Sequence, residues 1–214
     1  MLDYIEENTE INEKNKYLMI FLHGWGSDKY DLISLTKDFN SVSKNIHYIS
    51  VNAPYSCDNG FGYQWFSLKN MDINYIQKEI INCNSILRDF LDFQSKRLNI
   101  EYNKIFLVGF SQGSMLSLYN GLTLQKQLAG VIAFSGLLPV TFDNAKNLLT
   151  TKQKILMTHG ENDNTIIPQL FEYSVEILKK FDFDISYHLL ENLGHSINDN
   201  CINFAKNFVK NIIF

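Results

Sequence analysis

Short apolar runs alternate with amphipathic stretches along the whole chain. Runs that are almost continuously apolar predict buried strands, and the last of them shows partial alternation; these runs cover residues 17–22, 46–51, 104–109, 130–135, 154–158 and 184–190. Stretches with helical spacing predict helices; they cover residues 31–39, 73–96, 112–125, 168–181 and 197–212. Strands that alternate with helices predict right-handed crossovers and a mostly parallel central sheet with helices on both faces.

Polar motifs follow several of the predicted strands. His23-Gly24 ends the first, Ser111 follows the third, and Asp163 and His195 come after the last two. Because the carboxyl ends of parallel strands meet at one edge of a sheet, where ligands bind, we expect these residues to share one site.

The pattern G-x-S-x-G occurs at Gly109-Phe110-Ser111-Gln112-Gly113, between a predicted strand and a predicted helix. This setting is the one in which the pattern marks a nucleophilic serine on a sharp turn. Side chains at positions 109 and 113 would collide with neighbouring backbone at so tight a turn. The helix that follows directs N–H groups toward developing negative charge. Ser111 is therefore the candidate nucleophile.

A serine hydroxyl is a weak nucleophile at neutral pH and needs a general base. His195 lies in the short loop between the last strand and the last helix, where the order Ser, acid, His places the base. We assign the remaining histidines to loop bracing or strand packing: His23, His47, His159 and His188.

The acid that orients the base should lie between Ser111 and His195 in the chain. Asp163, in the polar turn after residues 154–158, is the leading candidate. An aspartate there could also serve only as a turn or helix-capping residue. Glu161 in the same loop and Asp143 after the preceding strand remain open as alternatives.

Acyl transfer places negative charge on the carbonyl oxygen, which two backbone N–H groups usually bind. We expect one from Gln112, directly after the nucleophile, and one from Trp25 in the loop after the first long strand. Gly24 and Gly26 would let that loop approach Ser111 closely. The histidines lack metal-ligand spacing and no nucleotide-binding glycine motif follows a strand, so we expect neither metal nor cofactor.

Length and charge narrow the class of protein further. The 214 residues suit one domain, residues 1–214. A net charge of −4 gives no basic footprint for nucleic acid and no polybasic patch for membranes. The start of the chain is acidic, and no stretch has the apolar length of a membrane span. Three widely spaced cysteines fit a reducing compartment, so we expect a cytoplasmic protein without stable membrane insertion. The motifs leave the oligomeric state open.

Four segments together resemble one known family: L-H-G-W-G-S-D at residues 22–28, G-F-S-Q-G-S at 109–114, H-G-E-N-D at 159–163 and G-H-S at 194–196. They resemble, in order and over nearly the whole chain, the carboxylesterase and phospholipase family of α/β-hydrolases, which includes acyl-protein thioesterases and lysophospholipase-like esterases. The resemblance implies the α/β-hydrolase fold, the triad Ser111, Asp163 and His195, and an oxyanion hole of the amides of Trp25 and Gln112.

The chain departs from the family pattern at two places that bear on the substrate pocket. Trp25 stands where the family commonly has Leu, beside the predicted oxyanion hole. Gln64-Trp65-Phe66-Ser67 resembles the family's W-F-D segment only loosely. Phe61, Trp65 and Phe66 are either an apolar wall for an acyl chain or ordinary core packing under a long loop, and both readings stay open.

These observations favour a serine hydrolase that cleaves carboxylic ester or thioester bonds through an acyl-enzyme. A small ester, a lysophospholipid and an acylated protein all fit as substrates. Two alternatives remain: an amidase or peptidase on the same fold, and a non-catalytic ligand-binding protein on a hydrolase scaffold.

Overall fold

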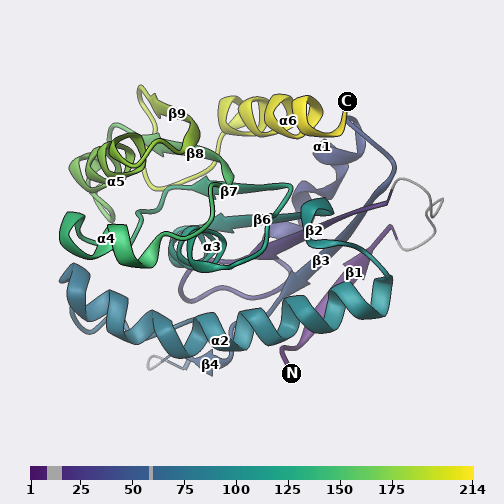
Figure 1. Ribbon diagram of the computed structural model, residues 1–214, viewed down its shortest axis with the longest axis horizontal. Helices are drawn as coiled ribbons and strands as arrows, with labels where there is room; N and C mark the ends of the chain where they lie inside the picture. Colours follow the sequence, from purple (N-terminus) through teal and green to yellow (C-terminus); the bar gives the residue numbers. More distant parts are fainter. Residues whose placement is uncertain (9–15, 58–59) are drawn as a thin grey trace.

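A computed structural model describes residues 1–8, 16–57 and 60–214, so two residues of the predicted loop 55–70 lie outside the described part. Seven strands form one sheet in the order β1-β3-β2-β6-β7-β8-β9 (Figure 1). Its strands are β1 (Tyr4–Glu7), β2 (Tyr17–Leu22), β3 (Ile46–Val51), β6 (Ile105–Phe110), β7 (Gly130–Phe134), β8 (Lys154–Gly160) and β9 (Asp184–Leu190). All neighbours pair in parallel except β1, which runs antiparallel to β3.

Helices cover both faces of this sheet (Figure 1), as the alternation of strands and helices predicts. One face carries α2 (Ile73–Leu98), α3 (Gln112–Thr123), α4 (Phe142–Leu148) and α5 (Pro168–Lys180). The other face carries α1 (Thr36–Asn40) and α6 (Asp199–Ile213). In the described part of the chain, no helix is long and apolar enough to cross a membrane.

The β2 strand shows why its sequence is apolar without alternation. Leu18, Ile20 and Leu22 pack into the core under α2 and α3. Met19 and Phe21 point to the opposite face, under α1 and α6. Successive side chains of a strand point to opposite faces, and here both faces are covered. Each such side chain contributes about 1.5–3 kcal/mol by leaving water.

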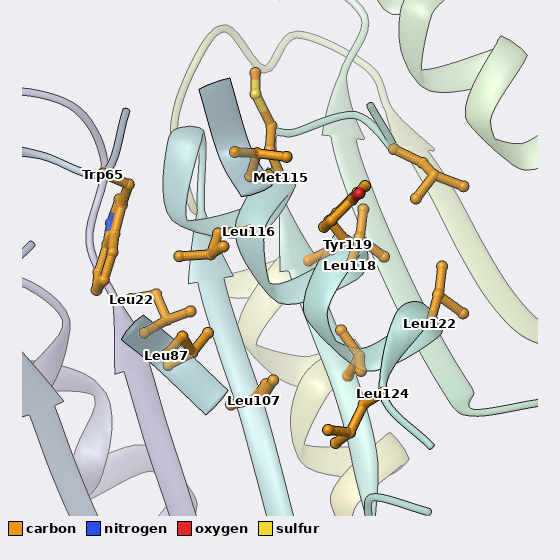
Figure 2. Close-up of a cluster of buried hydrophobic side chains, with 14 of the residues drawn as sticks. Leu22, Trp65, Leu87, Leu107, Met115, Leu116, Leu118, Tyr119, Leu122 and Leu124 are labelled. Atoms are coloured by element: carbon orange, nitrogen blue, oxygen red, sulfur yellow. The ribbon is translucent and has the colours of Figure 1, made fainter. Parts of the chain in front are cut away.

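The core on the α3 face surrounds the start of that helix. Figure 2 shows Leu22, Trp65 and Leu116 within the cluster of buried side chains around α3. Trp65 comes from the long connection after β3, so this connection is anchored in the core beside the carboxyl end of β2.

Several elements differ from the sequence-based expectations. The β1 strand was not predicted, because it is an edge strand with only partly buried side chains. The α4 helix lies where a loop was expected; a capping box between Thr141 and Asn144 begins it. The helix expected at residues 31–39 is a 3-10 helix, η2 (Leu32–Leu35), followed by α1, and a further 3-10 turn, η3 (Tyr102–Lys104), precedes β6. The loop 55–70 contains a short hairpin, β4 (Tyr55–Ser56) and β5 (Tyr63–Gln64).

The turn between β6 and α3 holds Ser111 in a left-handed backbone conformation, with φ of 52°. Such a φ is costly for a residue with a side chain and persists only where surrounding packing enforces it. A Cβ at Gly109 would lie 2.3 Å from the carbonyl oxygen of Gly113, and one at Gly113 would lie 2.0 Å from that of Leu22. The predicted collision at both glycines is therefore confirmed.

Replacing Gly113 by Ala tests this packing. The added Cβ would overlap backbone that cannot rotate away, so we expect Gly113→Ala to lower the free energy of unfolding by about 1–3 kcal/mol or more. Gly194→Ala is the matched control, because the nearest atom to its Cβ is 3.8 Å away. The melting temperatures of both variants would be measured by calorimetry. Equal melting temperatures would contradict the account.

Candidate active site

Three residues from separate loops form one hydrogen-bonded chain at the carboxyl edge of the sheet. Ser111 Oγ lies 2.9 Å from His195 Nε2, and His195 Nδ1 lies 2.7 Å from Asp163 Oδ2. Ser111 follows β6, Asp163 follows β8, and His195 lies between β9 and α6. The carboxyl ends of neighbouring parallel strands bring together residues that are up to 84 positions apart.

Asp163 is almost completely buried, and all its partners hold it in one orientation. The N–H groups of Thr165 and Ile166 donate to Oδ1, each over 2.9 Å. Oδ2 is left to face His195. The two N–H donors fix the plane of the carboxylate. This arrangement holds Oδ2 of Asp163 as the acceptor for the N–H at Nδ1 of His195. The other ring nitrogen, Nε2, can then accept a proton from Ser111.

His159 also contacts Asp163, which the sequence did not indicate. Its Nε2–H donates to the carbonyl of Ile166 over 2.8 Å and lies 3.3 Å from Oδ2 of Asp163. The side chain is completely buried and stacks on Phe171. The signal that could have revealed the contact is the four-residue spacing of His159 and Asp163 around a tight turn.

The other candidates for acid and base lie elsewhere. Glu161 is exposed, and Asp143 lies in the first turn of α4. Neither makes a recorded hydrogen bond to His195. His23 is buried below the first loop: its Nε2 accepts from the N–H of Ala53 and its Nδ1–H donates to Gly24 O. His23 therefore braces that loop.

The loop after β2 lies against Ser111. A Cβ built at Gly24 would be 3.4 Å from Ser111 Cβ, so the next residue, Trp25, lies beside the serine. The α3 helix begins at Gln112, and an N–H in the first turn has no acceptor within its own helix. The two amides expected to bind an oxyanion thus belong to backbone that flanks Ser111.

The hairpin strand β5 holds this loop in place. The N–H of Gly26 donates to Tyr63 O over 2.9 Å, and the N–H of Tyr63 donates to Ser27 O over 2.8 Å. The Trp25 indole N–H donates to Gln64 Oε1. Backbone pairing of this kind limits the freedom of the loop next to the serine.

Trp65 and Phe66 tie the same segment to α3. The Trp65 N–H donates to Gln112 Oε1, and Gln112 Nε2 donates to Phe66 O. The Trp65 indole donates to His23 O. The relative exposure is 0% for Trp65 and 2% for Phe66, whereas it is 78% for Phe61. In this structure Trp65 and Phe66 are buried braces of the site, and Phe61 lies at the surface.

Burial lowers the pKa of His159 and of His23 below the ordinary value of 6.5, because desolvation penalises the charged form. The backbone contact with Ile166 partly opposes this shift at His159, and the contact with Gly24 does so at His23. Both rings are therefore neutral in the native protein at neutral pH.

These pKa shifts predict how stability depends on pH. Below about 6.5 the unfolded chain binds protons at His23 and His159 that the native state does not bind. The free energy of unfolding should then fall as pH drops, until the native pKa is reached. The slope approaches about 1.4 kcal/mol per pH unit for each such histidine.

His159→Gln removes the contribution of His159 to this pH dependence, because Gln keeps an N–H donor but does not titrate in this range. Urea unfolding between about pH 7.5 and 5 should show a shallower loss of stability for His159→Gln than for wild type. Equal slopes in the two proteins would contradict the assignment of a buried neutral ring.

Comparison with known proteins places this geometry in a family. Residues 5–213 match the model of the family described as Phospholipase/Carboxylesterase. The chain is 26% identical to acyl-protein thioesterase 1 homolog 1 of Dictyostelium discoideum, over 98% of this chain and 97% of that protein. It is 32% identical to acyl-protein thioesterase 1 of Schizosaccharomyces pombe, over 71% and 70% of the two chains.

Solved structures agree with this match. The crystal structure of esterase PE8 has a TM-score of 0.91 and 29% identity, and covers 99% of each chain. The Bacillus cereus carboxylesterase, at 19% identity, has a TM-score of 0.80 over 99% of this chain and 95% of that chain, and shows the shared fold. The expected α/β-hydrolase fold and the family resemblance are confirmed. The chain belongs to the phospholipase/carboxylesterase family.

Proposed function

We propose that this protein is a serine hydrolase that cleaves ester or thioester bonds with Ser111 as nucleophile, His195 as general base and Asp163 as the acid that orients it. The single observation that carries the proposal is the continuous hydrogen-bonded chain from Ser111 through His195 to Asp163. Membership of the family makes the chain a hydrolase enzyme of the ester and thioester class, and the assignment of roles to residues is our inference.

The reaction begins when Ser111 Oγ attacks the acyl carbonyl and its proton passes to His195 Nε2. The imidazolium that forms is stabilised by Asp163, whose Oδ2 lies 2.7 Å from Nδ1. His195 then donates the proton to the leaving oxygen or sulfur as the acyl bond breaks. Water, activated by the same ring, attacks the acyl-enzyme and releases the acid.

The amides of Gln112 and Trp25 bind the oxyanion in this proposal. Donors that are fixed before the reaction stabilise the transition state without reorganising. The contacts of Tyr63, Trp65 and the Gln112 side chain supply this rigidity, since they connect both donor segments.

The substrate class follows from the family. The relatives are named acyl-protein thioesterase and carboxylesterase, and we propose an acylated protein or a small ester as substrate. Residues 1–214 act as one catalytic domain in this proposal. The cytoplasm is the proposed location, which rests on the odd number and wide spacing of the three cysteines.

Substituting the nucleophile tests the proposal. Ser111→Ala should lose labelling by a fluorescent fluorophosphonate and lose about 10⁴-fold or more of kcat/KM on a p-nitrophenyl ester. Ser135→Ala is the matched control: Ser135 also ends a strand at positive φ, but its hydroxyl donates to Ser196 O. It should still label. A folded wild-type protein that neither labels nor turns over any ester would contradict the proposal and favour a binding protein.

A further inference from the structure

A pocket of about 290 Å³ opens beside His195, on the side of the sheet that carries η2 and α6. Its apolar wall consists of Leu32, Leu35, Phe110 and Ile197, and His195 forms one side. Asp31 also lines it and is exposed. None of these residues was expected at the site from the sequence except His195, because the pocket is assembled from three separate segments.

The position of the pocket relative to the reaction decides which part of a substrate it can take. In the tetrahedral intermediate the oxyanion faces the amides beside Ser111, and the leaving atom must face His195 Nε2 to receive its proton. Groups attached to the leaving atom therefore extend past the imidazole ring. The pocket that His195 and Phe110 line, with their rings 5.0 Å apart, borders the imidazole ring.

One carboxylate, that of Asp31, lines this pocket. The Asp31 carboxylate accepts a hydrogen bond from Ser27 Oγ over 2.8 Å, which leaves its charge uncancelled. Lys29, in the same loop, is paired with Asp3, since its Nζ lies 2.8 Å from both carboxylate oxygens. The loop between the oxyanion segment and η2 thus presents the Asp31 carboxylate to an incoming leaving group.

We infer that the pocket of Asp31, Leu32, Leu35, Phe110, His195 and Ile197 is the leaving-group subsite, and that it selects alcohols or thiols with an apolar body and a neutral or cationic end over anionic ones. This inference rests on the proposed function. In the step concerned, the bond from Ser111 Oγ to the acyl carbon forms, the bond to the leaving sulfur or oxygen breaks, and the serine proton leaves with that atom through His195.

Three thioesters with one acetyl group and different thiols test the charge selection. The thiols are thiocholine, its neutral isostere 3,3-dimethylbutanethiol, and 3-mercaptopropanesulfonate. We expect kcat/KM to fall from the cationic to the neutral thiol and from the neutral thiol to the sulfonate, by about two- to fivefold for each unit of charge, the range that exposed charges produce. High salt should reduce these differences.

Three variants assign the effect to the pocket. Asp31→Asn should reduce the dependence on leaving-group charge, measured as the ratio of kcat/KM between the cationic thioester and the sulfonate. Asp38→Asn, on α1 and outside the pocket, changes the net charge equally and should keep the dependence. Leu35→Ala should lower kcat/KM more for the branched neutral thiol than for a methyl thioester.

The outcomes separate this inference from the proposed function. If fluorophosphonate labels Ser111 and the neutral thioester is hydrolysed, but Asp31→Asn behaves as wild type toward all three thiols, the leaving-group subsite is wrong and the proposed function stands. If Ser111 does not label and no ester is hydrolysed, the proposed function itself fails.

Discussion

The close packing of α3 against the ends of β2 and β6 is the constraint on which the site depends. Gly109 and Gly113 leave no room for a Cβ, because the turn brings the backbone of the helix onto that of both strands. This contact forces Ser111 to positive φ and places its hydroxyl above the sheet. It also places the first N–H groups of α3 next to the serine. One backbone contact therefore positions both the proposed nucleophile and one proposed oxyanion donor.

The second half of the site is organised by the segment from Tyr63 to Phe66. It pairs with the loop after β2 through Gly26 and Ser27, and it binds the side chain of Gln112 at the start of α3. A third element thus joins the loop and the helix, in addition to their direct contact. Buried hydrogen bonds of this kind are costly to break, because each leaves an unpaired polar group. The aromatic cluster of this segment supports the site from beneath it.

The sequence was most informative where a local physical requirement can be met by only one type of residue. The apolar run of β2, the glycines around Ser111 and the loop of His195 each had such a signal. Edge strand β1, helix α4 and the contact of His159 with Asp163 did not, because partial burial and tertiary contacts decide them. For the same reason the sequence left Trp65 between two readings, and the structure shows its side chain fully buried. The pocket beside His195 joins residues from three segments, and no local pattern reveals such a surface.

Direct observation of the covalent intermediate tests the central claim. Wild-type protein would be mixed with an excess of an acetyl thioester, quenched in acid within the first turnovers, and measured by intact-protein mass spectrometry with peptide mapping. The account predicts one added acetyl group on the peptide that contains Ser111, and none after Ser111→Ala. Hydrolysis that proceeds with no adduct on that peptide, or with an adduct on another residue, would contradict it.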